Sequence, residues 1–79
     1  MKVVNGGIYQ HFKGHMIQVL EIAKHTETEE MLVIYEHKET RTIWARPYDM
    51  FISKVDKEKY PQIEQEYRFQ LIEEANNNN

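Results

Sequence analysis

Hydrophobic and polar residues alternate in short blocks along the first 55 residues, and polar or glycine-containing turns separate the blocks. Alternation with a period of two is typical of a β-strand that buries one face. The continuous apolar run from Met31 to Tyr35 favours a strand covered on both faces. We therefore expect five short strands, whose close spacing predicts a meander closed into a small β-barrel. Their expected positions are 8–12, 15–24, 31–35, 42–46 and 52–55.

Two short segments predict how these strands are connected and where one of them ends. Lys13-Gly14 predicts a tight hairpin turn, because glycine adopts positive φ without steric cost. Pro47 has no N–H for a central ladder and should end the strand before it. We expect the next four residues, Tyr48-Asp49-Met50-Phe51, to form a single helical turn.

The C-terminal segment has a different pattern. Apolar residues recur at i, i+4, i+8 and i+12 from Ile63, which predicts a helix beginning near Pro61. A strand is the competing interpretation, because alternate residues around Phe69 are also apolar. We favour the helix because the segment is long and rich in Glu and Gln. The predicted organisation is a barrel domain over 1–60, a helix over 61–75 and a disordered tail over 76–79.

Composition limits the class of protein. A chain of 79 residues forms one domain, and domains of this size bury only roughly 60% of their unfolded surface. The absence of cysteine excludes disulfides and thiolate metal sites and fits a reducing cytoplasm. The sequence has neither the apolar region of a signal peptide nor an apolar run long enough to span a membrane. We therefore expect a soluble, cytoplasmic protein.

Charge gives no support for nucleic-acid binding. Residues 1–60 contain nine Lys/Arg and nine Asp/Glu, whereas residues 61–79 contain one Arg and four Glu. The first part is therefore neutral (9 − 9 = 0) and the second carries the whole net charge of −3 (1 − 4). Neither part has a basic stripe along the sequence.

Several short motifs occur together and in a characteristic order. They are Gly7-Ile8-Tyr9-Gln10-His11-Phe12-Lys13-Gly14, Val19-Leu20, Ala23-Lys24-His25-Thr26-Glu27-Thr28, Val33-Ile34-Tyr35 and Trp44-Ala45-Arg46-Pro47 with Met50-Phe51. This series, over about residues 7–63, resembles the DUF1653 family, small bacterial proteins of unknown function. The resemblance implies a compact SH3-like β-barrel and a cytoplasmic bacterial origin, and it implies no activity.

The chain departs from this family pattern at two places. The family usually has glycine after the motif that ends at Thr28, whereas this chain has Glu29. A glutamate at positive φ would be strained, so we expect a wider turn here. The extension beyond Tyr67 is also longer than the family's usual ending.

Histidines are the first candidates for chemistry. His11 and His15 have the i, i+4 spacing of a helical metal pair, but a turn is predicted between them. His11 and His25, at the ends of neighbouring predicted strands, could approach each other with Glu27 nearby. The simpler interpretation is that they are surface residues that hydrogen-bond to their own turns. We therefore predict no metal site and no cofactor.

Evidence for an enzyme is weak. The sequence contains no nucleophile elbow, no phosphate-binding glycine-rich loop and no Cys/His pair. Most carboxylates fall in polar loops, where nothing would raise their pKa toward neutrality. Ser53 is the only serine and has no base beside it in the sequence. We assign no catalytic residue and favour a protein that is not an enzyme.

An aromatic and basic face is the stronger candidate. Alternation places Trp44 and Arg46 on one side of their strand, and we take the side with Ile43 and Ala45 as the core face. We expect Phe12 and Tyr35 to fill the core. In small barrels, aromatic residues at one rim form a surface for peptides, modified side chains or unstacked bases. The predicted ligand-binding residues are Tyr9, His11, His25, Trp44 and Arg46.

Three functional hypotheses follow. The first is an uncharacterised binding or accessory module that uses this face for a peptide, nucleotide or nucleic-acid ligand. The second is a small enzyme or enzyme subunit acting on nucleotides or nucleic acids through His11, His25 and Glu27. The third is a structural homodimer formed through the apolar stripe of the C-terminal helix.

Overall fold

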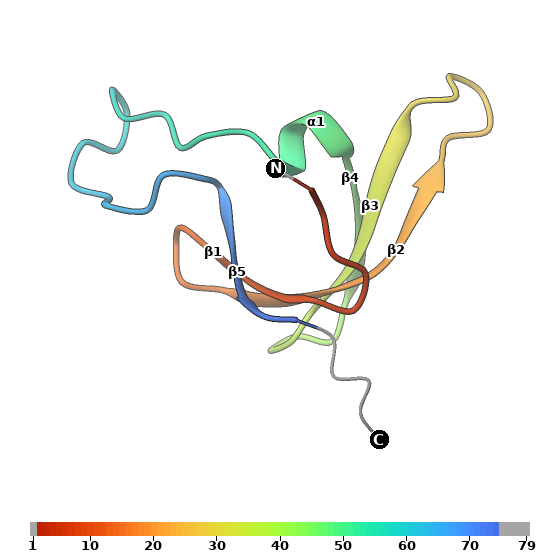
Figure 1. Ribbon diagram of the computed structural model, residues 1–79, viewed down its shortest axis with the longest axis horizontal. Coiled ribbons are helices and arrows are strands. Elements are labelled where there is room, and N and C mark those ends of the chain that lie inside the picture. The colour runs from red at the N-terminus through yellow and green to blue at the C-terminus, as the bar shows by residue number, and fades with distance from the viewer. Residues whose placement is uncertain (1, 75–79) are drawn as a thin grey trace.

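Five strands and one helical turn form in residues 2–74, the part of the chain that the computed structural model describes (Figure 1). They are β1 Ile8–His11, β2 Met16–Lys24, β3 Met31–His37, β4 Ile43–Pro47, α1 Tyr48–Phe51 and β5 Phe69–Glu73. The mainly-β class, the first four predicted strands and the helical turn after Pro47 are thus confirmed. None of the described helices is long and apolar enough to cross a membrane.

The strands form one antiparallel sheet in the order β4-β3-β2-β1-β5. β4 and β5 are its two edges and do not pair with each other, so the sheet is open. The predicted closed SH3-like barrel is therefore wrong. The reason lies in the connection after Pro47, where α1 and a long loop carry the chain away from β4. The chain returns as β5, which pairs with β1 and not with β4, so the two edges of the sheet stay apart.

The predicted C-terminal helix over 61–75 is also wrong. Its second half contains β5, in which Phe69 is buried and faces the core, while Leu71 packs against the core from the same side. The alternating pattern was therefore the relevant one, because the free edge of β1 supplies hydrogen-bond partners that override helix propensity. The homodimer hypothesis loses the helix on which it depended. The predicted tail over 76–79 lies outside the described residues.

The predicted fifth strand over 52–55 is reduced to one isolated bridge, between Lys54 and Tyr67. The loop around it is nevertheless attached to the rest of the molecule. Val55 is buried, and its N–H donates to the carbonyl of Glu66 at 2.9 Å. The N–H of Phe12, in the β1–β2 turn, donates to the carbonyl of Arg68 at 3.0 Å.

The β2–β3 and β3–β4 hairpins close in the same way. Glu29 in the first and Arg41 in the second both have φ of 63°. In each turn the N–H of this residue donates to the carbonyl four residues earlier, at 2.8 and 2.7 Å respectively. The expectation of a wider turn is therefore wrong, because Glu29 itself adopts the left-handed conformation. In the β1–β2 hairpin, Gly14 adopts positive φ, as predicted.

A β-bulge bends β2 in its middle. The pairing with β3 skips a residue between Val19 and Glu21, so that Leu20 has no partner. Ile17 and Val19 face the core before the bulge, and Ile22 packs against it afterwards. The extra residue changes which alternate positions point inward. This explains why both faces of this strand contain apolar residues in the sequence.

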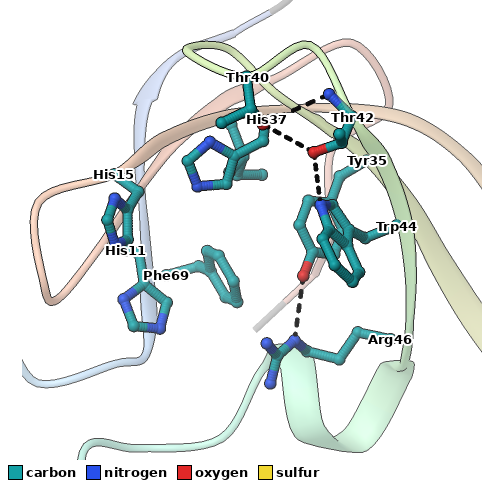
Figure 2. A pocket seen from close by; sticks show the side chains of 10 residues that line it. His11, His15, Tyr35, His37, Thr40, Thr42, Trp44, Arg46 and Phe69 are labelled. Atoms are coloured by element: carbon teal, nitrogen blue, oxygen red, sulfur yellow. Dashed lines mark hydrogen bonds between the residues drawn. The ribbon is translucent and has the colours of Figure 1, made fainter.

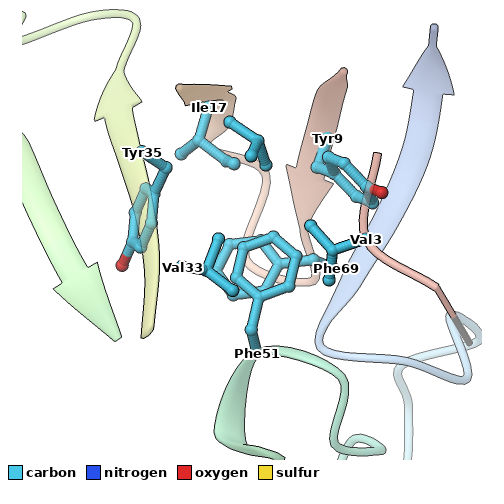
Figure 3. Close-up of a cluster of buried hydrophobic side chains, with 8 residues drawn as sticks. Val3, Tyr9, Ile17, Val33, Tyr35, Phe51 and Phe69 are labelled. Carbon is cyan, nitrogen blue, oxygen red and sulfur yellow. The ribbon is translucent and has the colours of Figure 1, made fainter. Parts of the chain in front are cut away.

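The core lies on the concave side of the sheet, beneath α1 and the N-terminal segment (Figures 1 and 3). Phe51 from α1 is fully buried and stacks on Phe69 with centroids 4.2 Å apart. Tyr9 meets the ring of Phe51 edge-on at 5.3 Å. The remaining members of the cluster are Val3, Ile17, Val19, Val33 and Tyr35. Tyr35 is thus in the core as predicted, whereas Phe12 is only half-buried.

Candidate functional site

A pocket of about 330 Å³ lies on the concave face, where the inner side of the sheet extends beyond the cover of α1 (Figure 2). Every strand contributes to it, because its walls are the inward-facing positions of the same alternation that builds the core. It is open to solvent and contains no Asp or Glu side chain in its lining. The lining residues are His11, His15, Ile17, Tyr35, His37, Thr40, Thr42, Trp44, Arg46 and Phe69.

Trp44 forms one wall of the pocket. The register pairs it with Tyr35, whose side chain points inward, so the indole of Trp44 points to the same side. Its Nε1–H donates to Oγ1 of Thr42 at 2.8 Å, and this hydroxyl lies 2.7 Å from Oγ1 of Thr40. The threonines restrain the ring, yet 54% of the residue remains exposed. An aromatic surface is therefore held in place and left open.

Arg46 lies on the same strand face, two residues further along. Its guanidinium carbon is 5.6 Å from the ring centroid of Phe69, and its Nε–H donates to the hydroxyl of Tyr35 at 3.4 Å. Within residues 2–74, no carboxylate lies within ion-pair distance of this guanidinium. Most of its N–H donors therefore remain available to a ligand.

The opposite face of β4 is not the core face that we predicted. Ile43 is 62% exposed, and Ala45 is exposed as well. β4 is an edge strand that curves with the sheet, so the side facing Tyr35 is the inner one, although it carries a tryptophan and an arginine. Trp44 and Arg46 thus occupy positions where a longer core would have had apolar residues.

Three histidines form the wall opposite Trp44 (Figure 2). The ring of His11 stacks on Phe12 at 4.4 Å and meets Phe69 edge-on at 5.1 Å. His15 lies between the other two, 5.9 Å from His11 and 5.0 Å from His37 by ring centroids. Nδ1 of His37 is buried and has no hydrogen-bond partner among the described residues. The described residues contain no group of three side chains arranged to hold a metal ion.

The pKa of His11 is lowered to about 4, so its imidazole is neutral at neutral pH. Burial is the largest cause, and the nearby charge of Arg46 is the next. Nδ1 of this ring accepts the N–H of Lys13 at 3.1 Å, which leaves the proton on Nε2. His11 therefore offers a neutral hydrogen-bond donor.

Of the five residues predicted to bind a ligand, His11, Trp44 and Arg46 line this pocket and the other two do not. Tyr9 is 1% exposed and belongs to the core, where its hydroxyl accepts the N–H of Val4 at 2.9 Å. His25 lies in the β2–β3 turn, where its Nδ1 accepts two backbone N–H groups of that turn.

The catalytic group suggested for the enzyme hypothesis is not assembled. His25 and Glu27 are close, with 3.8 Å between Nδ1 and Oε1. His11, however, ends β1 and bonds to His15 just before the start of β2, whereas His25 follows the end of this nine-residue strand. At a rise of about 3.3 Å per residue, roughly 30 Å of strand separates the two ends.

Four polar lining residues, His15, His37, Thr40 and Thr42, were not among the predicted ligand-binding residues. A signal for two of them was present. Alternation places His37 on the same face as Tyr35, and Thr42 on the same face as Trp44. This alternation identifies pocket residues only when it is known that these strand faces point inward.

The fold and the pocket define a class: small antiparallel-β proteins with a ligand-sized pocket on the open concave face of a single sheet. The family model described as "protein of unknown function (DUF1653)" matches residues 7–71. The chain therefore belongs to the DUF1653 family, as the motifs indicated. A crystal structure of a DUF1653 protein from Bordetella bronchiseptica is similar in fold, with a TM-score of 0.74 and 24% identity over 92% of each chain. No curated protein matches this sequence.

Proposed function

We propose that this protein is a non-catalytic binding module whose pocket accepts a small, planar, anionic group of the kind that a nucleotide presents. The observation that carries the proposal is the placement of Trp44 beside Arg46 on the wall of an open pocket without carboxylates. The indole offers a face for stacking, and the guanidinium offers donors for an anion.

The size and energetics of the pocket support one nucleotide as the ligand. A volume of about 330 Å³ is at the small end of the range of ligand pockets, roughly 300–1,000 Å³. Stacking of a base on an aromatic side chain contributes about 1–3 kcal/mol. A charge-assisted hydrogen bond from Arg46 to a phosphate contributes about 1.5–3 kcal/mol. Both contributions require the arrangement of Trp44 and Arg46 that the sheet provides.

The histidines favour recognition over catalysis. Neutral His11 can donate a hydrogen bond from Nε2 to the edge of a base, because its Nδ1 already accepts the N–H of Lys13. At neutral pH His11, with its pKa lowered to about 4, is a weak general base, and nucleophilic chemistry would need a hydroxyl activated by an adjacent imidazole. The lining has no carboxylate, and its two threonines bond to each other.

The proposal is tested by titrating the fluorescence of Trp44, the only tryptophan, with AMP, GMP, CMP and UMP. The matching nucleosides, which lack the phosphate, serve as comparison ligands. We expect saturable quenching by at least one nucleotide. Loss of the contact between phosphate and Arg46, about 1.5–3 kcal/mol, should make the nucleoside about 10- to 100-fold weaker.

Two arginine variants make the test specific. Arg46→Gln should lower nucleotide affinity by the same factor and leave nucleoside affinity nearly unchanged. Arg41→Gln is the matched control, because Arg41 lies in the adjacent hairpin and pairs with Glu36 without lining the pocket. Circular dichroism establishes that both variants are folded. The proposal is wrong if no nucleotide gives a saturable change, or if both variants weaken binding equally.

A further inference from the structure

A second groove, of about 410 Å³, adjoins the pocket and shares His11 and Arg46 with it. Five of the ten Lys and Arg residues of the chain line this groove, which we call the basic groove. They come from the β1–β2 turn, from β4 and from the loop between α1 and β5. The five residues are Lys13, Arg46, Lys54, Lys59 and Arg68.

The basic groove is a built feature, because packed side chains hold its two walls together. Tyr60 from the long loop meets the ring of Phe12 edge-on at 4.9 Å. Nζ of Lys13 lies 5.5 Å from the centroid of Tyr60, and Nζ of Lys59 lies 5.6 Å from the same ring. Arg68 donates from Nε to Oγ of Ser53 at 3.0 Å. The lysine stems are thus positioned by aromatic rings, and their ammonium groups stay accessible.

The positive charge in the basic groove is poorly balanced. Lys54 pairs with Glu66 at 3.4 Å, but the other four cations have no carboxylate within ion-pair distance in the described part of the chain. Asp56 is the one acid in the lining, and its Oδ1 accepts the backbone N–H groups of the turn that follows it. A chain of net charge −3 therefore concentrates unpaired positive charge at one place beside the pocket.

The same cations affect the pKa of His11. Besides burial, the charges of Arg46, Arg68 and Lys13 all act to lower it. These three cations belong to different segments of the chain and converge on one ring, which stands between the pocket and the basic groove. Local positive potential of this kind raises the affinity and association rate of anionic partners.

We infer that the basic groove binds the phosphodiester backbone of a single-stranded nucleic acid, one base of which occupies the Trp44 pocket. This inference rests on the proposed function, which supplies the base. A single strand is required because the bases of a duplex are stacked and paired and do not reach a concave aromatic pocket. The groove begins at Arg46, where a phosphate attached to the bound nucleoside would lie, and continues toward Lys13 and Lys59.

The test is the binding of fluorescein-labelled oligo(dT) and oligo(U) of eight nucleotides, followed by anisotropy between about 25 and 200 mM salt. For single strands the slope of log K against log[salt] is about −0.7 per phosphate contacted. Contacts to three or four phosphates predict a slope of about −2 to −3. A blunt duplex and an octamer of glutamate are the comparison ligands, and both should bind at least tenfold more weakly.

Paired lysine variants locate the contacts. Lys13→Gln/Lys59→Gln should reduce the slope by about 1.4, the contribution of two phosphates, and should weaken octamer binding at least tenfold at low salt. The control Lys24→Gln/Lys38→Gln removes the same charge from residues that do not line the groove; Lys38 donates to Gln18 instead. This control should change neither the salt slope nor the affinity for the octamer. Circular dichroism checks folding, and the salt slope of the unaltered protein remains informative if a variant unfolds.

The possible failures are distinguishable. Mononucleotides that bind at Trp44, with octamers that bind no tighter and show no salt slope, would overturn the basic groove and leave the proposed function intact. An octamer affinity that depends on Lys13 and Lys59 while no mononucleotide binds would overturn the proposed function, and with it the placement of a base. Equal affinity for the glutamate octamer would overturn the assignment to nucleic acid.

Discussion

Glu29 holds a backbone conformation that glycine would hold at a lower free energy, so Glu29→Gly should stabilise this protein. Its φ of 63° lies in the left-handed region, which costs a residue with a Cβ about 1–2 kcal/mol. Glycine avoids this cost but loses more conformational entropy on folding, by about 0.5–1 kcal/mol. The side chain of Glu29 is exposed and makes no hydrogen bond or ion pair within residues 2–74. The net gain should therefore be about 0.5–1 kcal/mol.

Two control variants separate backbone strain from charge. Glu30→Gly removes the same side chain from the adjacent, exposed position, which does not have positive φ. It should lower stability by about 0.5–1 kcal/mol, because it adds only the entropic cost of glycine. Glu29→Ala removes the carboxylate and keeps the strained backbone, so its stability should stay within about 0.5 kcal/mol of the unaltered protein.

Urea unfolding followed by circular dichroism measures these differences, and thermal unfolding provides an independent estimate. For a domain of this size a gain of 0.5–1 kcal/mol should raise Tm by about 2–8 °C. Backbone strain at Glu29 is excluded if Glu29→Gly is no more stable than the unaltered protein. It is also excluded if Glu29→Ala is stabilised equally, because the effect would then come from removal of a charge.

Three further predictions concern the core, the C-terminal strand and pH. Phe51→Ala should lower the free energy of unfolding by about 3–5 kcal/mol in urea titrations, because the ring is fully buried against Phe69. Truncation after Tyr60 should unfold the chain, as seen by circular dichroism, because it removes β5 and the buried Phe69 that pairs with His11. The folded-state pKa of His11, about 4, is below the usual 6.5, so the unfolded state binds this proton more readily. The resulting stability is complete above about pH 6.5 and is lost as pH falls toward 4. The full shift corresponds to about 3 kcal/mol, which solvent screening at a half-exposed ring reduces to about 1–2 kcal/mol. Urea titrations at pH 7.5 and 4.5 should show this loss in the unaltered protein and a smaller one in His11→Asn, which keeps a hydrogen-bond acceptor for the turn.

Local patterns predicted the local structure well. Alternation and turn residues located four strands, and Pro47 marked the end of the fourth. The errors concerned long-range pairing. A closed barrel requires the last strand to pair with both β4 and β1, whereas β5 pairs with β1 alone, and no pattern within a strand specifies its partners. The segment around Phe69 was assigned to a helix for the same reason, since a strand at this position is stable only when the edge of β1 is available.

The candidate site was predicted in part for a related reason. Alternation correctly placed Trp44 with Arg46 on one face of their strand. It did not indicate which face of an edge strand would be the inner one, and His25 was included because its distance from His11 depends on the course of β2. The basic groove could not be predicted, because its cations are separated in the sequence by acidic residues and converge only in the folded chain.

The core and the pocket are two parts of one sheet face, and this continuity bears on function. The four residues of α1 bury one part of the concave face beneath Phe51 and leave the other part open. Apolar side chains at His37 and Arg46 would extend the core, whereas Nδ1 of His37, which has no hydrogen-bond partner within residues 2–74, costs about 1–3 kcal/mol. A domain of this size has a free energy of unfolding of only about 4–12 kcal/mol, so polar residues at these inward positions lower its stability substantially. Polar residues that oppose local packing rules in this way are expected at functional sites. This cost independently supports the proposal that the open part of the face is a binding surface.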